Sequence, residues 1–248
     1  SHTTLPGGRW PNIGSRWASR WPGSASSFKR AGMSIAYQRQ MAAAASKAVT
    51  VLLHPLLMPV YCTLLTLFGA TPYGGLPHDI NVRVLRAVGI FACANPLMVI
   101  GAFIIMGKVS ELEMPSRAER VWPLLASGCA IGLSLLALNV HNTPRPLLGM
   151  ILGESLALLL AGLCSLRWKV SLHAIGSGAL LAYVSETGMA YHLDFAPWAA
   201  AAFVCAGLTA WARLYAKAHT RRQLLGGYAV GVIVMGVTMN MVMSRPVL

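Results

Sequence analysis

Residues 212–223 read ARLYAKAHTRRQ, a basic segment between two long apolar runs. Its basic side chains are Arg213, Lys217, His219, Arg221 and Arg222. Two other short polar segments also separate apolar runs, RWKVSLH at 167–173 and PSRAERVWP at 115–123. The fold of the intervening apolar runs decides whether the charged side chains of these three segments come together.

The composition is that of a membrane protein. The chain is 56% hydrophobic and only 11% charged, whereas soluble domains carry about 25% charged residues. The formal charge of +13 is spread between apolar runs and not along one amphipathic surface. We therefore expect anionic membrane lipids and a phosphorylated substrate as partners, and no nucleic acid. The five cysteines lie in apolar runs without a CxxC pair, and we interpret them as small hydrophobic residues.

The apolar runs predict an all-α fold, a polytopic integral membrane bundle of about seven spans. The His54-Pro55 and Asn95-Pro96 pairs predict breaks within the first two spans, and 71–84 reads as a loop. Gly176, Gly178 and Gly188 predict close helix packing in the fifth span. The predicted spans are 48–70, 85–107, 121–140, 146–166, 171–190, 198–215 and 224–243.

The N-terminal segment 1–46 is basic and differs from the transmembrane domain predicted over 47–248. It is rich in Gly, Ser, Trp and Arg, and its first methionine is Met33. We interpret residues 1–32 as a leader or appended segment that takes no part in the fold.

Seven spans place the loops after the second, fourth and sixth spans on one side, together with the N-terminus. These are the loops that hold the three basic segments. That side carries 16 Lys and Arg residues against 4 on the other, and 11 against 4 without residues 1–32. The positive-inside tendency then predicts a cytoplasmic N-terminus and cytoplasmic basic loops.

The side chains of these loops suit a phosphate group. Arginine binds two phosphate oxygens with its planar fork. Ser171 opens the fifth span, where a serine caps the helix and free N–H groups favour an anion. His173 lies in the same first turn. Gln223 follows His219 by one turn, so its amide oxygen can hold one ring nitrogen and leave the other free to attack phosphorus.

These residues resemble motifs of the type 2 phosphatidic acid phosphatase (PAP2) superfamily. Arg213-x5-His219-x3-Gln223 resembles the third motif, in which an Arg, a His and an Asp have these separations. Ser171-Leu172-His173 resembles the end of the second motif, Pro-Ser-Gly-His, and the order of helices and motifs also matches over 165–245. The wider pattern resembles divergent PAP2-like membrane proteins of Bacteroidetes-type bacteria, through HPLLMP at 54–59, RAERVWP at 117–123, WKVSLH at 168–173 and AHTRRQLLGGYAVG at 218–231.

The resemblance implies a bacterial inner-membrane phosphatase without a metal or cofactor. His219 would form a phosphohistidine, His173 would protonate the leaving oxygen and Gln223 would orient His219. The substrate would be phosphatidic acid, phosphatidylglycerol phosphate or a polyprenyl diphosphate. The first motif of the family, a Lys followed by Arg-Pro, is missing from its expected place. The phosphate oxygens would be held by Arg213, Ser171, Lys169, Arg120 and Arg117.

Two other hypotheses remain open. Gln223 replaces an Asp, and Val170 and Leu172 replace the Pro and Gly of the second motif, so the chain could be a catalytically silent binder of anionic lipid headgroups or of a membrane partner. Glu154 and Glu186, two acids at membrane depth, suggest a transporter. The lack of an internal repeat speaks against that third hypothesis.

Overall fold

The computed structural model describes residues 24–138 and 143–244, with side chains from residue 36 on. Within these ranges every regular element is a helix, which confirms the predicted all-α class. The chain divides into two compact units, Ser1–Ala44 and Ala45–Leu248. Of the predicted leader, residues 1–23 lie outside the described residues, and residues 24–32 are helical.

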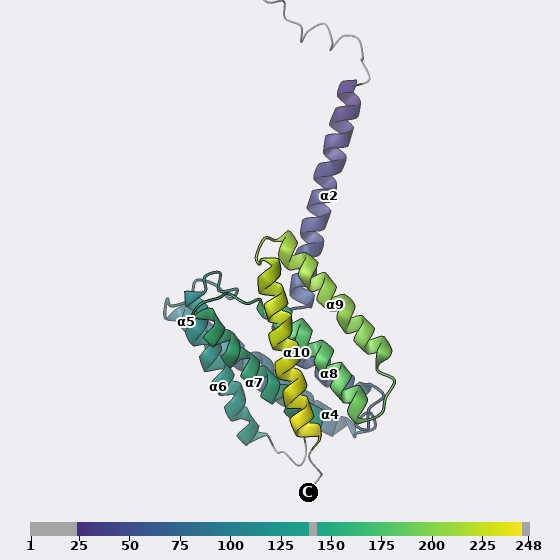
Figure 1. Ribbon diagram of the computed structural model, residues 1–248, viewed down its shortest axis with the longest axis vertical. Coiled ribbons are helices and arrows are strands. Elements are labelled where there is room, and N and C mark those ends of the chain that lie inside the picture. Colours follow the sequence, from purple (N-terminus) through teal and green to yellow (C-terminus); the bar gives the residue numbers. More distant parts are fainter. Residues whose placement is uncertain (1–23, 139–142, 245–248) are drawn as a thin grey trace, which may run out of the picture. The chain divides into compact units, whose positions relative to one another are not determined.

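The second unit holds the helices that carry the site (Figure 1). The boundary between the two units in the chain falls within α2. The elements are α2 (Ser24–Leu52), η1 (Pro55–Leu57), α3 (Met58–Phe68), α4 (His78–Val88), η2 (Gly89–Ala94), α5 (Asn95–Ile105), η3 (Ala118–Arg120), α6 (Val121–Ala137), α7 (Arg145–Ser165), α8 (Leu172–Ala190), α9 (Ala196–Tyr215) and α10 (Arg221–Met243).

Among the described residues, four continuous helical stretches are long and apolar enough to cross a membrane, which is compatible with an integral membrane protein. Ala36–Leu52 and Pro55–Phe68, bent by 43°, make a fifth if the pair is one broken span. Helices α8 and α9 are long enough but less apolar. The four stretches are His78–Ile105, Ala118–Ala137, Arg145–Ser165 and Arg221–Met243.

Both predicted proline breaks mark irregular backbone. At the first, the Nδ1 atom of His54 accepts the N–H of Leu56 at 3.3 Å and caps the short 3-10 turn that Pro55 begins. At the second, a π-helical turn, η2, immediately precedes Asn95-Pro96. Proline has no N–H and cannot continue the helical ladder, so the preceding turn rearranges.

The predicted loop 71–84 is wrong in its second half, because α4 begins at His78. The polar residues in this half form the first turns of α4. Asp79 lies in the first turn, where a negative charge is favoured, and it forms an ion pair with Arg83 at 2.8 Å. The helix of the second predicted span therefore begins before residue 85, the start that its hydrophobic residues alone indicated.

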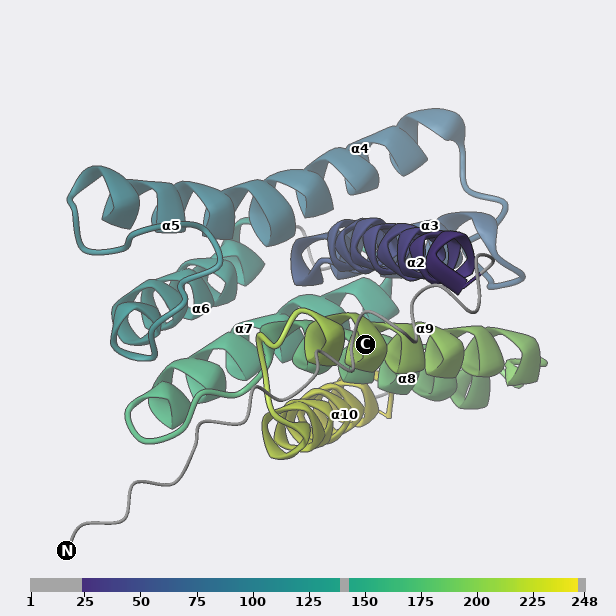
Figure 2. The same cartoon turned by 90° about the horizontal axis from the view of Figure 1, so that it is seen from above.

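Helices α8 and α10 are parallel and nearly touch at their backbones. Figure 2 shows α8 beside α10, with α7 next to them. A Cβ atom on Gly231 would lie 2.1 Å from the carbonyl oxygen of Ile175, and one on Gly178 would lie 2.8 Å from the carbonyl of Tyr228. Only glycine at these positions leaves room for α8 and α10, which carry the predicted motifs, to approach so closely.

The Gly231→Ala variant is expected to unfold at a lower temperature than the wild type. The added methyl group must push α10 away from α8, and such overpacking costs about 1–3 kcal/mol. Gly236→Ala, on the same helix, is the control because its Cβ would meet only Glu186 at 3.8 Å. Thermal unfolding in one detergent measures both variants, and equal unfolding temperatures would contradict the close approach.

Candidate functional site

Arg120 ties the loop before α6 to the loop before α8. Its side chain is buried, with 4% of the residue exposed. Nε donates to the carbonyl of Met114 at 2.8 Å, Nη2 to that of Glu113 at 3.1 Å and Nη1 to that of Val170 at 2.9 Å. Because a guanidinium has five N–H groups, these three bonds leave two for a ligand. The first two basic segments therefore meet, as the order of spans predicted.

The third segment joins them through the starts of α8 and α10. The backbone N–H of Ser171 donates to the carbonyl of Gln223 at 3.3 Å. Ser171 caps α8, as predicted, by accepting the N–H of Ala174 at 3.4 Å. Thr220 caps α10 in a capping box with Gln223. Two parallel helices thus present their N-termini side by side, which favours a negative charge in front of them.

His219 lies between the end of α9 and the start of α10. Helix α9 closes in a Schellman motif, with the N–H of Ala218 on the carbonyl of Arg213 at 3.1 Å and Lys217 at φ 52°. Thr220 then caps α10, so His219 lies just before the first residue of the helix. This short connection leaves the His219 residue 7% exposed.

Gln223 holds the His219 ring, as their spacing predicted. Its Oε1 atom lies 3.3 Å from His219 Nδ1 and also accepts the N–H of Thr220 at 3.0 Å. An amide oxygen only accepts hydrogen bonds, so Nδ1 carries the proton in this contact. Nε2 of the neutral ring then keeps its lone pair, the form that a nucleophile needs.

The surrounding charges keep His219 neutral. Burial first, and then the positive charges of Arg120, Arg213 and Lys169, together lower the pKa of His219 to about 4. The pKa of Lys169 is itself lowered, first by burial and then by Arg120 and Arg213. At neutral pH the site therefore combines an uncharged imidazole with a group of cations.

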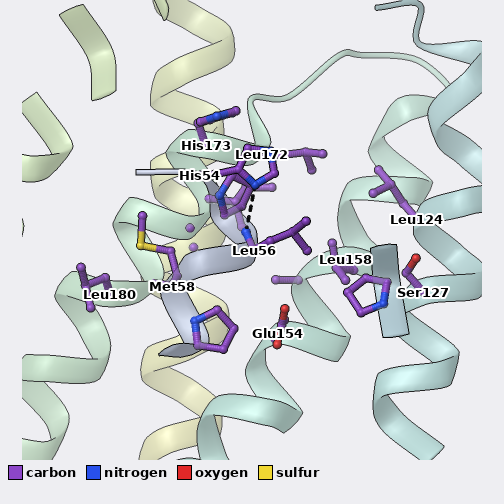
Figure 3. Close-up of a pocket in the computed structure, with 18 of the residues that line it drawn as sticks. His54, Leu56, Met58, Leu124, Ser127, Glu154, Leu158, Leu172, His173 and Leu180 are labelled. Carbon is purple, nitrogen blue, oxygen red and sulfur yellow. Dashed lines mark hydrogen bonds between the residues drawn. The ribbon is translucent and has the colours of Figure 1, made fainter. Parts of the chain in front are cut away.

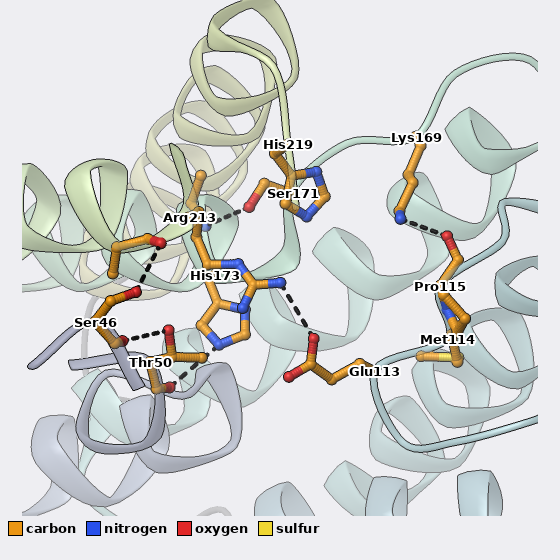
Figure 4. A network of polar contacts seen from close by, with 12 residues as sticks. Ser46, Thr50, Glu113, Met114, Pro115, Lys169, Ser171, His173, Arg213 and His219 are labelled. Carbon is orange, nitrogen blue, oxygen red and sulfur yellow. Dashed lines mark hydrogen bonds and ion pairs between the residues drawn. The ribbon is translucent and has the colours of Figure 1, made fainter. Parts of the chain in front are cut away.

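Arg213 is buried at the end of α9, with its side chain 6% exposed. Nη2 forms an ion pair with Glu113 Oε2 at 3.3 Å, while Nε has no hydrogen-bond partner within the described residues. In Figure 4 the side chain of Arg213 lies close to those of His173 and His219, and a dashed line marks its ion pair with Glu113. A buried guanidinium with an unused donor is suited to bind an anion.

The backbone just before the first proline break holds the His173 ring. Its Nε2 lies 3.3 Å from the carbonyl of Thr50, and because a carbonyl only accepts, Nε2 donates. The ring meets that of His54 edge to face, with centroids 5.1 Å apart. Nδ1 of His173 is therefore the nitrogen left for chemistry.

One cavity of about 150 Å³ connects these groups to the middle of the bundle. Its polar end is lined by His54, Glu113, Arg120, His173, Arg213 and His219. Figure 3 shows how side chains of several helices close around it. Most of the remaining wall is apolar, including Met58, Cys62, Ile100, Leu124, Met150, Leu158, Leu180 and Met235.

The structure separates the predicted site residues into three groups. Four of them line the cavity: His173, His219, Arg213 and Arg120. Ser171 and Gln223 do not line the cavity: Ser171 caps the helix that carries His173, and Gln223 holds the His219 ring. Lys169 and Arg117 do not line the cavity, because Lys169 Nζ donates to the carbonyl of Pro115 and Arg117 Nη1 donates to that of Arg167 at 2.9 Å.

Two cavity residues, Glu113 and His54, were not among the predicted site residues. Glu113 shares a polar loop with other charged residues, and no spacing distinguishes it. The HPLLMP pattern contained His54 but gave it no role. Of the two intramembrane acids behind the transporter hypothesis, Glu154 lines the cavity and Glu186 does not.

Comparison of the chain with models of known protein families, with curated proteins and with solved structures gave no match. These comparisons therefore assign neither a family nor a function. The resemblance to the PAP2 superfamily remains a prediction, carried by the residues at 171–173 and 213–223.

Proposed function

We propose that the chain is a membrane lipid phosphatase, which removes phosphate from a lipid phosphate or diphosphate through a phosphohistidine. The observation that carries this proposal is the cavity, whose histidine- and arginine-lined end opens into an apolar body. A lipid phosphate has the same division into an anionic head and a hydrocarbon tail. A site of this kind needs its cations at one end and apolar side chains along the rest.

Three groups at the polar end have defined steps in the reaction. Arg213 holds the phosphate oxygens through its fork and neutralises their charge. Nε2 of His219 attacks phosphorus, so that a P–N bond forms as the P–O bond to the lipid breaks. The negative charge of the bound phosphate favours the protonated form of His173, whose Nδ1–H gives its proton to the leaving oxygen. A water molecule, deprotonated by His173, then cleaves the P–N bond and releases inorganic phosphate.

The proposal includes a PAP2-like core with seven spans in a bacterial inner membrane and a cytoplasmic N-terminus. Helices α8 and α9, 19 and 20 residues long, would complete the seven. Twelve residues of α8 are buried, many of them small or polar, and a helix enclosed by others needs little apolar surface. The contacts that join the three basic loops support the order of spans on which the topology depends.

The second candidate is a silent PAP2-like protein that binds anionic lipid headgroups or a membrane partner through the same cavity. Gln223 favours it, since an amide orients His219 but does not stabilise the positive charge of its imidazolium. Glu113 favours it too, because its carboxylate already occupies one side of Arg213.

Phosphate release by the purified protein in detergent micelles separates the two candidates. The panel comprises phosphatidic acid, phosphatidylglycerol phosphate and a polyprenyl diphosphate, each with its binding measured in parallel. Release from at least one lipid at a rate that follows protein concentration supports the phosphatase. Tight binding of the panel with no release would support the silent binder.

The Gln223→Glu variant is expected to raise kcat by about tenfold, which corresponds to roughly 1.4 kcal/mol at the transition state. The glutamate has the shape of glutamine and adds a negative charge beside His219 Nδ1. It also raises the pKa of His219, so the acidic limb of the kcat/KM profile moves to higher pH. Gln38→Glu, exposed on α2, is the control. A variant with unchanged kcat and pH profile would contradict the positioning role of Gln223.

A further inference from the structure

Two polar groups lie deep in the cavity, away from the cationic end. The Ser127 hydroxyl and Oε2 of Glu154 are both buried and have no hydrogen-bond partner among the described residues. The Ser127 residue is 1% exposed, and both residues line the cavity. Buried polar atoms without a partner are uncommon in proteins, so a pair of them in one cavity requires an explanation.

The two groups lie at the same depth on neighbouring helices. Ser155 Oγ on α7 donates to the carbonyl of Gly128 on α6 at 2.8 Å. Ser127 precedes Gly128 and Glu154 precedes Ser155, so this bond fixes them at one level. Figure 3 shows both on the part of the lining that lies away from His54 and His173.

The helix geometry gives their distance from the polar end. Arg120, which lines that end, lies seven residues before Ser127 on the continuous stretch Ala118–Ala137. Seven residues of α-helix rise about 10 Å. Between them, Leu124 contributes an apolar side chain to the wall. A ligand with its phosphate at Arg213 therefore reaches Ser127 and Glu154 with a part of its chain close to the headgroup.

We propose that Ser127 and Glu154 form a second subsite, which binds a hydroxyl or amide group that the amphiphile carries about 10 Å from its phosphate. The inference deepens the proposed function and depends on it only for the position of the phosphate. It selects lipid phosphates that carry such a group over lipids that have only hydrocarbon at that depth.

The chemistry of the two side chains gives this preference. A ligand hydroxyl donates to Glu154 Oε2 and accepts from Ser127 Oγ, so it satisfies both groups. An amide does the same with its N–H and its carbonyl. A methylene group at that depth forms no hydrogen bond, so it leaves both Ser127 Oγ and Glu154 Oε2 unpaired. A site that hydrogen-bonds a ligand group discriminates against an analogue that lacks the group, because its own polar atoms then stay unpaired.

The test uses two phosphonate amphiphiles of equal chain length, one with a hydroxyl about 10 Å from phosphorus and one without it. Phosphonates are not hydrolysed, so binding to the micellar protein is measured alone. The wild type is expected to bind the hydroxylated compound about five- to tenfold more tightly. Ser127→Ala and Glu154→Leu are expected to abolish the difference, while Glu154→Gln, which keeps the shape of the side chain, reduces it.

Ser134→Ala is the matched control, because it removes the same atom from α6 outside the cavity lining. Its preference for the hydroxylated compound should equal that of the wild type. Equal binding of the two compounds by the wild type, no binding of either, or a preference that survives in both Ser127→Ala and Glu154→Leu would overturn the subsite. A preference without phosphate release from any lipid would keep the subsite and refute the phosphatase, and release without a preference would do the reverse.

Discussion

The His219→Ala variant is expected to lose phosphate release by at least about a thousandfold, because it removes the nucleophile that forms the covalent intermediate. His219 combines the required properties: Gln223 holds Nδ1, and burial and neighbouring cations keep the ring neutral. The loss should appear in kcat, since the phosphate is still held by Arg213. Phosphate release from the lipid that the wild type hydrolyses best measures it.

Three further measurements make this result specific to His219. His78→Ala removes an exposed imidazole at the start of α4 and should leave the rate unchanged. A rapid quench in alkali should trap phosphate on wild-type His219 and not on the alanine variant.

Because the nucleophile must be neutral and its pKa is about 4, kcat/KM should be retained in mild acid and lost as the pH falls through that value. Undiminished release by His219→Ala would refute the mechanism.

The Arg213→Ala variant is expected to lose kcat/KM by about a hundred- to a thousandfold, the effect of removing an oriented donor from a developing charge. Binding of a phosphonate should weaken as well, because the buried cation beside His219 is gone. Arg213→Lys should recover only part of the loss, since an ammonium lacks the two-oxygen fork. Steady-state kinetics and phosphonate binding on the same preparations measure both effects.

Glu113 complicates the loss of Arg213, because its carboxylate then loses this ion pair and repels the phosphate. The double variant Arg213→Ala with Glu113→Ala separates removal of the arginine from release of the carboxylate. Arg222→Ala is the control, since that arginine is exposed at the start of α10. If Arg213→Ala bound phosphonate as tightly as Arg222→Ala, the anion site would lie elsewhere in the cavity.

The local features of this protein could be predicted from its sequence. Helix positions follow from runs of apolar residues, and most boundaries agree with the structure within a few residues. The Ser171 cap and the His219–Gln223 contact were predictable because each joins residues within one turn of the chain. The meeting of the three basic loops was predictable too, since it depends only on the order of the helices. Interactions over short sequence distances leave a spacing that can be recognised.

The roles of individual side chains depended on contacts between distant segments. The sequence could not show that Arg120 uses three donors on backbone carbonyls, that Lys169 reaches Pro115 or that Glu113 reaches Arg213. The cavity itself is formed by five or more helices whose small residues permit close approach. Periodicity tells which face of a helix is apolar, but it does not tell which neighbouring side chain takes up each donor. The packed structure decides that, because burial forces every polar group to find its partner among the residues that happen to surround it.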